Sequence, residues 1–241
     1  MISVCMATYN GGKHIREQIE SILPQLSLDD EIIISDDGST DETVTIINSF
    51  NDNRIKLFFN KKEKKLTSKH ALVTRNFENA LTNARGDIIF LSDQDDIWKD
   101  NKINICMTFL KNHDLVLSNY DLIDNVGSIT ERMCLKFNPI SKNFMKNILK
   151  MPFHGCCMAF RKDILVTALP FPNNLLLHDN WIGMIAFMND KNKIKFINKS
   201  LIMYRQHGNN VSGISNNSLF FKLYYRVVFC CKLYIRILLK K

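Results

Sequence analysis

Apolar runs and amphipathic stretches alternate regularly through the first 111 residues. Short apolar runs that end in polar residues predict strands, and these runs occupy residues 2–7, 31–37, 54–60 and 87–93. Apolar positions spaced three and four apart predict helices between them, at residues 12–23, 39–50, 70–84 and 98–111. Strands that alternate with helices form βαβ units around a parallel sheet. We therefore expect a three-layer α/β/α, Rossmann-like fold with a mostly parallel central sheet.

The pattern becomes less regular in the second half, so the chain divides into a regular half, 1–112, an irregular half, 113–216, and a tail, 217–241. We expect residues 1–216 to form one domain and the tail to form a C-terminal amphipathic helix. The irregular half predicts a strand, a loop with a short helix, a strand, a helix and one or two late strands, at residues 114–124, 125–150, 154–160, 178–188 and 193–210.

Polar residues gather directly after three of the predicted strands. These segments are "TYN" at 8–10, "SDDGS" at 35–39 and "SDQDD" at 92–96. In open α/β sheets, ligands bind outside the carboxyl ends of the strands. We therefore expect the three segments to meet at one edge of the sheet and to form a binding site.

The third segment contains three acids within four positions, Asp93, Asp95 and Asp96. Neighbouring carboxylates raise each other's pKa unless a cation lies among them. Carboxylate oxygens suit Mg²⁺ or Mn²⁺, which keep several waters and usually share their coordination shell with phosphates. The cluster therefore indicates an open divalent-metal site that a diphosphate completes. The alternative is a turn in which Asp96 caps the next helix.

The segment after the second strand combines two acids with a glycine. Gly38 permits a backbone turn that other residues avoid. Asp36 and Asp37 lie at the strand end, where a carboxylate can accept hydrogen bonds from a base or bridge ribose hydroxyls. The same residues also fit a plain strand-to-helix turn with Ser39 or Thr40 as the N-cap residue.

Positive charge is concentrated at the end of the chain. The net charge is +8, and removing the six cations of residues 217–241 leaves +2 for residues 1–216. A nearly neutral body argues against a nucleic-acid partner, which requires a broad basic face. The seven cysteines form no C-x-x-C ladder, which favours buried thiols in a reducing cytosol. The first residues do not resemble a signal peptide, and we expect no membrane-spanning helix because no apolar run reaches ~20 residues.

The tail, residues 219–241, separates its charged and apolar positions on a helical wheel. A basic stripe opposite a wide aromatic and aliphatic face is typical of a helix that lies in a membrane interface. The alternative is a terminal helix that packs on the domain or on a partner copy. At 100° per residue, five cations fall within roughly 120°: Lys222, Arg226, Lys232, Arg236 and Lys240.

Together, the segments "SVCMATYNGG", "EIIISDDGSTDET" and "GDIIFLSDQDDIW" resemble the family 2 glycosyltransferases over roughly residues 1–110. The later segments "HGCCMAF", "HDNWI" and "YRQHGNNVSG" are similar to the subset often assigned as rhamnosyltransferases. The resemblance implies a nucleotide-diphospho-sugar transferase fold. Residues 1–112 would bind the nucleotide sugar and residues 113–216 the acceptor.

The resemblance also implies roles for individual residues. Asp95 would bind the Mn²⁺ or Mg²⁺ that holds the diphosphate, and His207 would touch the metal or the diphosphate. Asp179, in "HDNWI", would take the acceptor proton, although an acid at the front of a helix is also a common helix-terminal charge. The remaining donor contacts implied are Thr8, Tyr9, Asn10, Asp37, Gly38, Asp93, Gln94 and Arg205.

The function implied is metal-dependent, inverting transfer of a sugar, with rhamnose as one candidate, from a nucleoside diphosphate sugar to a saccharide or lipid-linked acceptor. We expect a cytoplasmic enzyme of surface polysaccharide synthesis, peripheral on the inner face of the cell membrane, for which a homodimer is one possible state. One alternative is a nucleotidyltransferase, but "TYNGGKHIR" is a faint version of its Gly-rich basic loop. Another is a nucleotide-sugar-binding module without chemistry, against which Asp95 and Asp179 argue.

Overall fold

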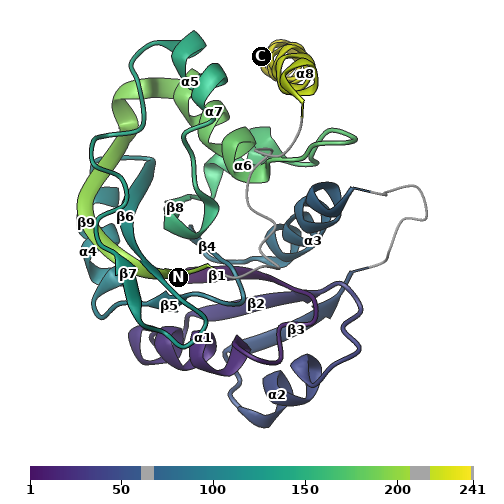
Figure 1. Cartoon of the computed structure of the whole chain (residues 1–241), viewed down its shortest axis with the longest axis vertical. Helices are drawn as coiled ribbons and strands as arrows, with labels where there is room; N and C mark the ends of the chain where they lie inside the picture. The colour runs from purple at the N-terminus through teal and green to yellow at the C-terminus, as the bar shows by residue number, and fades with distance from the viewer. Residues whose placement is uncertain (61–67, 207–217, 240–241) are drawn as a thin grey trace.

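A computed structural model describes residues 1–60, 68–206 and 218–239 (Figure 1). The described strands form one nine-stranded sheet of order β3-β2-β1-β4-β8-β6-β9-β5, with β7 paired to β6. The strands are β1 (Ile2–Thr8), β2 (Glu31–Asp36), β3 (Ile55–Phe59), β4 (Ile88–Ser92), β5 (Ile97–Trp98), β6 (Leu115–Ile123), β7 (Ile129–Glu131), β8 (Met158–Arg161) and β9 (Ile194–Arg205). The helices are α1 (Ile15–Ile22), α2 (Thr43–Ser49), α3 (Lys69–Asn83), α4 (Lys102–Leu110), α5 (Phe144–Lys150), α6 (Asp163–Ala168), α7 (His178–Asp190) and α8 (Leu219–Leu239), with 3-10 turns η1 (Leu23–Gln25), η2 (Gly155–Cys157) and η3 (Lys191–Lys193).

The N-terminal half forms the predicted parallel sheet. β1 lies between β2 and β4, β3 pairs with β2, and all four strands are parallel. Helix α3 covers one face of these strands, while α1 and α2 cover the other (Figure 1). Strands buried on both faces require nearly continuous apolar sequence, which explains why β1, β2 and β4 are almost entirely buried. The three-layer arrangement is therefore as predicted.

An antiparallel strand joins the two halves of the sheet. β8 lies between β4 and β6 and runs opposite to both, whereas β6 and β9 are parallel. β5 and β7 also run against their neighbours. The sheet is therefore mixed but mostly parallel, since β1, β2, β3, β4, β6 and β9 share one direction.

The sheet curls (Figure 1), and the strands β4 and β5, which are adjacent in sequence, lie far apart in strand order. β4 is central, while β5 begins just after it, at Ile97, and is the last strand, paired with β9. The acidic segment 93–96 is the connection between them. This segment therefore runs from the middle of the sheet to its edge strand.

Tertiary pairing changes the predicted pattern at several places. The helix expected at 98–111 begins only at Lys102, because Ile97 and Trp98 pair with β9. The strand-like segment 154–160 divides into the turn η2 and the strand β8. The short elements β7 and α6 were not predicted.

Helix α8 packs on the domain through a narrow ridge. Tyr225, Phe229 and Leu233 are its buried residues, and the Phe229 ring meets the ring of Trp181 edge-on at 5.7 Å. Trp181 is fully buried, so it packs in the core. None of the helices described has both the length and the apolar character that crossing a bilayer requires.

The basic stripe of α8 faces the domain. Arg226 donates to the carbonyl of Leu149 in the last turn of α5, and Arg236 donates to the carbonyls of Thr167 and Ala168 at the end of α6. The last carbonyls of a helix lack intrahelical partners and carry its negative dipole end. Arg226 and Arg236 therefore cap two helices, and α8 packs on the domain, which was the alternative stated for the tail.

Replacing Arg236 with methionine should destabilise the domain, because the carbonyls at the end of α6 lose their charged donor. Hydrogen bonds to charged groups contribute roughly 1.5–3 kcal/mol, so we expect a loss of about 2 kcal/mol in the free energy of unfolding, measured with urea. The exposed residue Lys13 offers a matched control, since Lys13→Met should change stability by less than about 0.5 kcal/mol. Equal stability of the two variants would contradict the capping role.

Candidate active site

Two of the predicted segments meet at the carboxyl ends of β1 and β2. Thr8 Oγ1 donates to Asp36 Oδ2 at 2.9 Å, and Asp36 Oδ1 accepts from the backbone N–H groups of Gly38 (3.0 Å) and Ser39 (2.8 Å). Gly38 has a φ of +75°, a conformation that glycine adopts without strain. Asp36 thus builds the turn, and the predicted base-binding acid, Asp37, lies next to it with 6% of its surface exposed.

The side chain of Gln94 connects the acidic segment to the loop after β1. It accepts from Tyr9 N at 2.9 Å and donates to Tyr9 O at 3.2 Å. Asn10 Oδ1 accepts from Thr40 N at 2.8 Å, which joins the loop after β2. A Cβ at Gly11 would lie 2.3 Å from Gln94 Oε1, so a larger residue there would displace the Gln94 side chain from this position. The three strand-end segments thus lie together, while the donor contacts of Tyr9, Asn10 and Gln94 stay predictions.

The acidic segment contains a compact group of possible metal ligands. One carboxylate oxygen each from Asp93 and Asp96 lies within 4.8 Å of the other and of Cys156 Sγ. Asp96 is 1% exposed, and its Oδ1 accepts from Arg205 N at 3.0 Å. Its Oδ2 has no hydrogen-bond partner among the residues that the structure describes. Asp96 precedes α4 by several residues and does not cap it, since Asn101 holds the N-cap position.

The charges in this group fit a divalent cation. Burial, followed by the charges of Asp95 and Asp179, raises the pKa of Asp93 to about 7, and burial raises the pKa of Asp96 well above its usual value. A bound cation favours the ionised form of such acids. Two carboxylates suit Mg²⁺ or Mn²⁺, whereas hard cations do not favour a thiol such as Cys156.

Two residues that were predicted as metal ligands, Asp95 and His207, are not members of this group. Asp95 is the neighbour of Asp93 and Asp96 but does not belong to the three residues whose ligand atoms converge. Its backbone carbonyl accepts from Arg205 Nε at 2.9 Å, so the main chain at Asp95 is fixed. Its role as a metal ligand stays a prediction. His207 lies outside the described residues.

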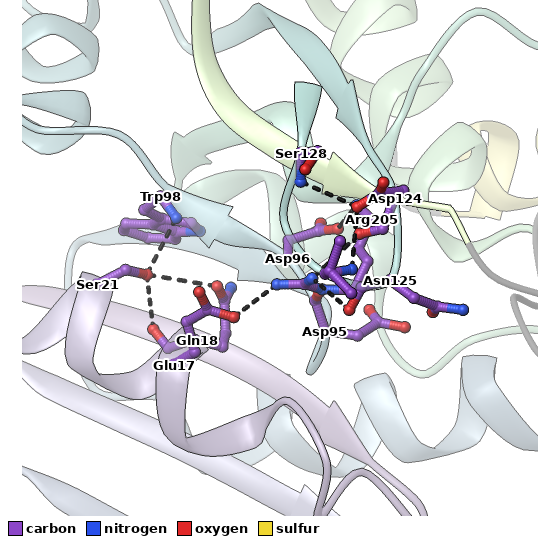
Figure 2. A network of polar contacts seen from close by, with 11 residues as sticks. Glu17, Gln18, Ser21, Asp95, Asp96, Trp98, Asp124, Asn125, Ser128 and Arg205 are labelled. Carbon is purple, nitrogen blue, oxygen red and sulfur yellow. Dashed lines mark hydrogen bonds and ion pairs between the residues drawn. The ribbon is translucent and has the colours of Figure 1, made fainter. Parts of the chain in front are cut away.

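Arg205 holds the acidic segment in place (Figure 2). Its side chain is almost fully buried, and besides Asp95 it binds the carbonyls of Asp124 and Asn125, each at 3.2 Å from Nη1. Nη2 donates to Glu17 Oε2 at 2.6 Å. Arg205 thus joins α1, the acidic segment and the turn after β6. This arrangement gives it a positioning role, and the predicted contact with the donor stays a prediction.

Lys102 is a second buried cation that the sequence analysis missed. It is 0% exposed, its Nζ donates to Cys156 O at 2.8 Å, and it lies 3.8 Å from the centre of the Trp98 ring. Its charge opposes the rise in the pKa of Asp93. Lys102 therefore offsets part of the acidic charge and fixes the turn η2. In the sequence, it has the pattern of an ordinary helix lysine, so no local signal could have found it.

Asp179 reaches the same site from the second half of the chain. It lies in the first turn of α7, where Oδ1 accepts from Asn180 N at 2.7 Å and Oδ2 from Gly155 N at 3.3 Å. Asp93 and Asp179 line one cavity, so both halves of the domain contribute acids to it. The other lining residues are His70, Val73, His154, Gly155, Cys156, Leu176, Leu177, His178 and Tyr204.

His178 gives this cavity an uncharged wall. Its ring stacks on Phe77 with centroids 4.1 Å apart, and it is 9% exposed. Burial lowers the pKa of His178, although the charge of Asp179 opposes this. A neutral imidazole suits contact with uncharged hydroxyl groups. The sequence analysis missed it, although it opens the "HDNWI" segment that carries part of the resemblance.

Residues 3–167 match the family model described as glycosyl transferase family 2. The chain belongs to this family. The match extends from β1 to α6, so it contains the strand-end segments and η2, while Asp179 lies just beyond it. The resemblance drawn from the three strand-end motifs is confirmed.

Two curated relatives show how far the similarity extends. The first, named UDP-Glc:alpha-D-GlcNAc-diphosphoundecaprenol beta-1,3-glucosyltransferase WfgD, from Escherichia coli, is 34% identical over 148 residues, 59% of this chain and 56% of that protein. The dTDP-rhamnosyl transferase RfbG of Shigella flexneri is 30% identical over 221 residues, 86% of this chain and 73% of that protein. The chain thus spans little more than half of the E. coli protein.

Solved structures confirm the fold. TarS of S. aureus in complex with UDP-GlcNAc has a TM-score of 0.70 at 20% identity, covering 95% of this chain and 66% of that one. Glucosyl-3-phosphoglycerate synthase from Mycobacterium tuberculosis, with Mn²⁺, UDP and glucosyl-3-phosphoglycerate, has a TM-score of 0.63 at 21% identity, covering 94% and 79%. The predicted nucleotide-diphospho-sugar transferase fold is therefore correct.

Replacing Arg205 with methionine should destabilise the domain, because the acidic segment loses the donors that join it to α1 and to the turn after β6. Charged hydrogen bonds of this kind contribute about 2–3 kcal/mol, which urea unfolding would measure. Arg16→Met is the matched control, since Arg16 also lies on this side of the domain but is 52% exposed at the side chain. A loss no larger than that of the control would show that Arg205 does not position the segment.

Proposed function

We propose that this protein transfers a sugar from a nucleoside diphosphate sugar to a hydroxyl group of a glycan acceptor. The observation that carries the proposal is the cavity lined by both Asp93 and Asp179. In this cavity, the strand ends, where a donor would bind, lie beside a carboxylate that can take a proton from the acceptor. Membership of glycosyl transferase family 2 supports the reaction class.

On the donor side, the residues after the strands bind and orient the nucleotide. Asp37 would accept from the base, and Asp93 would approach the ribose. Asp95 would hold the Mn²⁺ or Mg²⁺, which, when bound, offsets the negative charge of the leaving diphosphate. Asp93 and Asp96, whose carboxylate oxygens lie close together, are the alternative pair of ligands. Lys102 fixes this part of the chain through Cys156 O.

On the acceptor side, Asp179 would take the proton from the attacking hydroxyl group. Inverting transfer is a single displacement, so it requires a base within hydrogen-bond reach of the acceptor, opposite the leaving group. The N–H groups of Gly155 and Asn180 hold the Asp179 carboxylate in a fixed orientation. The neutral ring of His178 would contact sugar hydroxyl groups. In this division, residues 1–112 bind the donor and residues 113–216 bind the acceptor.

The names of the relatives suggest the classes of donor and acceptor. The rhamnosyl transferase matches 86% of this chain, including its second half, whereas the glucosyltransferase matches 59%. We therefore propose rhamnose as the first candidate sugar and a lipid-linked saccharide as the acceptor, in surface polysaccharide synthesis at the inner face of the cell membrane. Incubation with dTDP-rhamnose, UDP-glucose and UDP-GlcNAc in the presence of Mn²⁺, with detection of released nucleoside diphosphate, tests the donor.

The two alternatives from the sequence are weaker. No observation on the described residues favours a nucleotidyltransferase, and the family match argues against one. A binding module without chemistry would bind a donor but never release nucleoside diphosphate. Turnover in the same panel separates it from an enzyme.

Asp95→Asn should remove transfer and lower Mn²⁺-dependent binding of nucleoside diphosphate at least ~100-fold, because the acid joins cation and diphosphate. Titration calorimetry with UDP or dTDP, with and without Mn²⁺, measures this. Asp96→Asn is measured beside it, because Asp96 Oδ2 lacks a hydrogen-bond partner among the described residues and could bind the metal instead. If Asp96→Asn loses metal-dependent binding and Asp95→Asn keeps it, the metal lies on Asp93 and Asp96 and the motif-based assignment is wrong.

Asp179→Asn should lower kcat at least ~100-fold, the usual magnitude of general-base catalysis, while donor binding stays close to that of the wild type. The substitution keeps an oxygen that can accept from Gly155 N but cannot take a proton. Asp163→Asn is a matched control, because Asp163 also lies in the first turn of a helix, α6, and is exposed. A kcat within a few-fold of wild type, or retention at the anomeric carbon, would refute the role.

A further inference from the structure

The outward face of α8 is apolar along the whole helix. Contiguous apolar surface of this extent usually marks an interaction site. The cations of α8 do not interrupt it, because Arg226 and Arg236 bind carbonyls of the domain. Nine large apolar side chains are between 51% and 81% exposed: Leu219, Phe220, Leu223, Tyr224, Val227, Tyr234, Ile235, Leu238 and Leu239.

Helix α5 extends this surface. The rings of Phe144 and Tyr234 meet edge-on with centroids 6.0 Å apart, and both helices lie at the same end of the molecule (Figure 1). α5 adds Met145 and Leu149, which are 55% and 53% exposed. We call the nine side chains of α8 and these two the α5–α8 face.

Exposed cations border the α5 side of the α5–α8 face. Lys142, Lys146 and Lys150 are exposed on α5 and just before it. α5 itself, Phe144–Lys150, contains no acid. An apolar surface bordered by cations is complementary to a bilayer with anionic headgroups. A second copy of the chain is a poorer partner, because the two basic borders would repel each other.

We propose that the α5–α8 face docks on an anionic lipid bilayer. The apolar side chains of α8 enter the interface, and the lysines of α5 contact the headgroups. The sequence alone placed the cations of α8 in that contact, but they face the domain, and α5 supplies the charge instead. Docking on lipid deepens the proposed function, because a lipid-linked acceptor lies at such a surface. The reason for docking rests on that proposed function.

The acceptor side of the cavity lies beside this helix. Tyr225 of α8 accepts at its hydroxyl oxygen from Leu176 N at 3.3 Å. Leu176 lines the cavity that holds Asp179. Docking through α8 would therefore bring the proposed acceptor base close to the membrane surface.

Sedimentation of the full chain with vesicles of phosphatidylglycerol and phosphatidylcholine tests the proposal. Val227 and Leu238 are 63% and 69% exposed, so changing them should not disturb the fold. The double variant Val227→Asp with Leu238→Asp should lower the partition coefficient at least ~10-fold, because two charged groups would enter the interface. Leu28→Asp with Phe59→Asp is the matched control, since both residues are exposed far from the face, and it should bind like the wild type.

The charge contribution has its own test. Lys142→Glu, Lys146→Glu and Lys150→Glu together should lower binding at least ~10-fold, and the wild type should lose binding as salt rises or when phosphatidylglycerol is omitted. The control carries the same change in net charge elsewhere. It combines Lys111→Glu, Lys191→Glu and Lys199→Glu, all at exposed positions.

Three results would overturn the proposal. They are a wild type that does not sediment with anionic vesicles, variants that bind as well as their controls, and a dimer that Val227→Asp with Leu238→Asp dissociates, which would assign the face to a second copy. Vesicle binding needs no donor, and both sets of variants should keep wild-type turnover on a water-soluble acceptor. Vesicle binding without any turnover would refute the proposed function alone.

Discussion

The burial of the acidic segment between β4 and β5 is the constraint on which the site depends. Burial, and after it the neighbouring acids, raises the pKa of Asp93 and of Asp96. Uncompensated buried charge is strongly unfavourable in a folded protein. Lys102 and Arg205 reach this segment from α4 and from the end of β9, and both are almost fully buried. The charge of Lys102 offsets part of the rise in the pKa of Asp93, and the backbone N–H of Arg205 does the same at Asp96.

The curl of the sheet brings these cations to the acids. β5 pairs with β9, so Arg205, the last residue of β9, lies beside the acidic segment. The antiparallel strand β8 places the turn η2 next to it, where Cys156 O accepts from Lys102 and Gly155 N donates to Asp179. The turn η2 thus lies close to the acidic segment at Cys156 and contacts Asp179 through Gly155. The boundary at residue 112 therefore separates two patterns in the sequence, while the site itself contains residues from both sides.

The sequence predicted most of the N-terminal half, because its strands and helices follow local periodicity and its strand ends must meet in a parallel sheet. It did not predict Lys102, since a lysine in a helix has the same pattern whether it is buried or exposed. The segment 154–160 was predicted as one strand. Its apolar residues are buried in the turn η2 as well as in β8, so periodicity could not distinguish the turn from a strand. Asp179 was predicted through the resemblance, and it lines one cavity with Asp93 because residues far apart in the sequence pack together.

Helix α8 shows a different limit of sequence analysis. A helical wheel gives the relation between the basic and apolar faces, but it does not show which face meets the domain. The domain presents carbonyls at the ends of α5 and α6, and only charged donors with long stems can reach them along a packed surface. Arg226 and Arg236 fill this need, which turns the apolar side outward. An ordinary surface helix faces the solvent with its polar side, whereas α8 exposes apolar side chains on both sides of its buried ridge, and exposed apolar surface of this extent marks an interaction site.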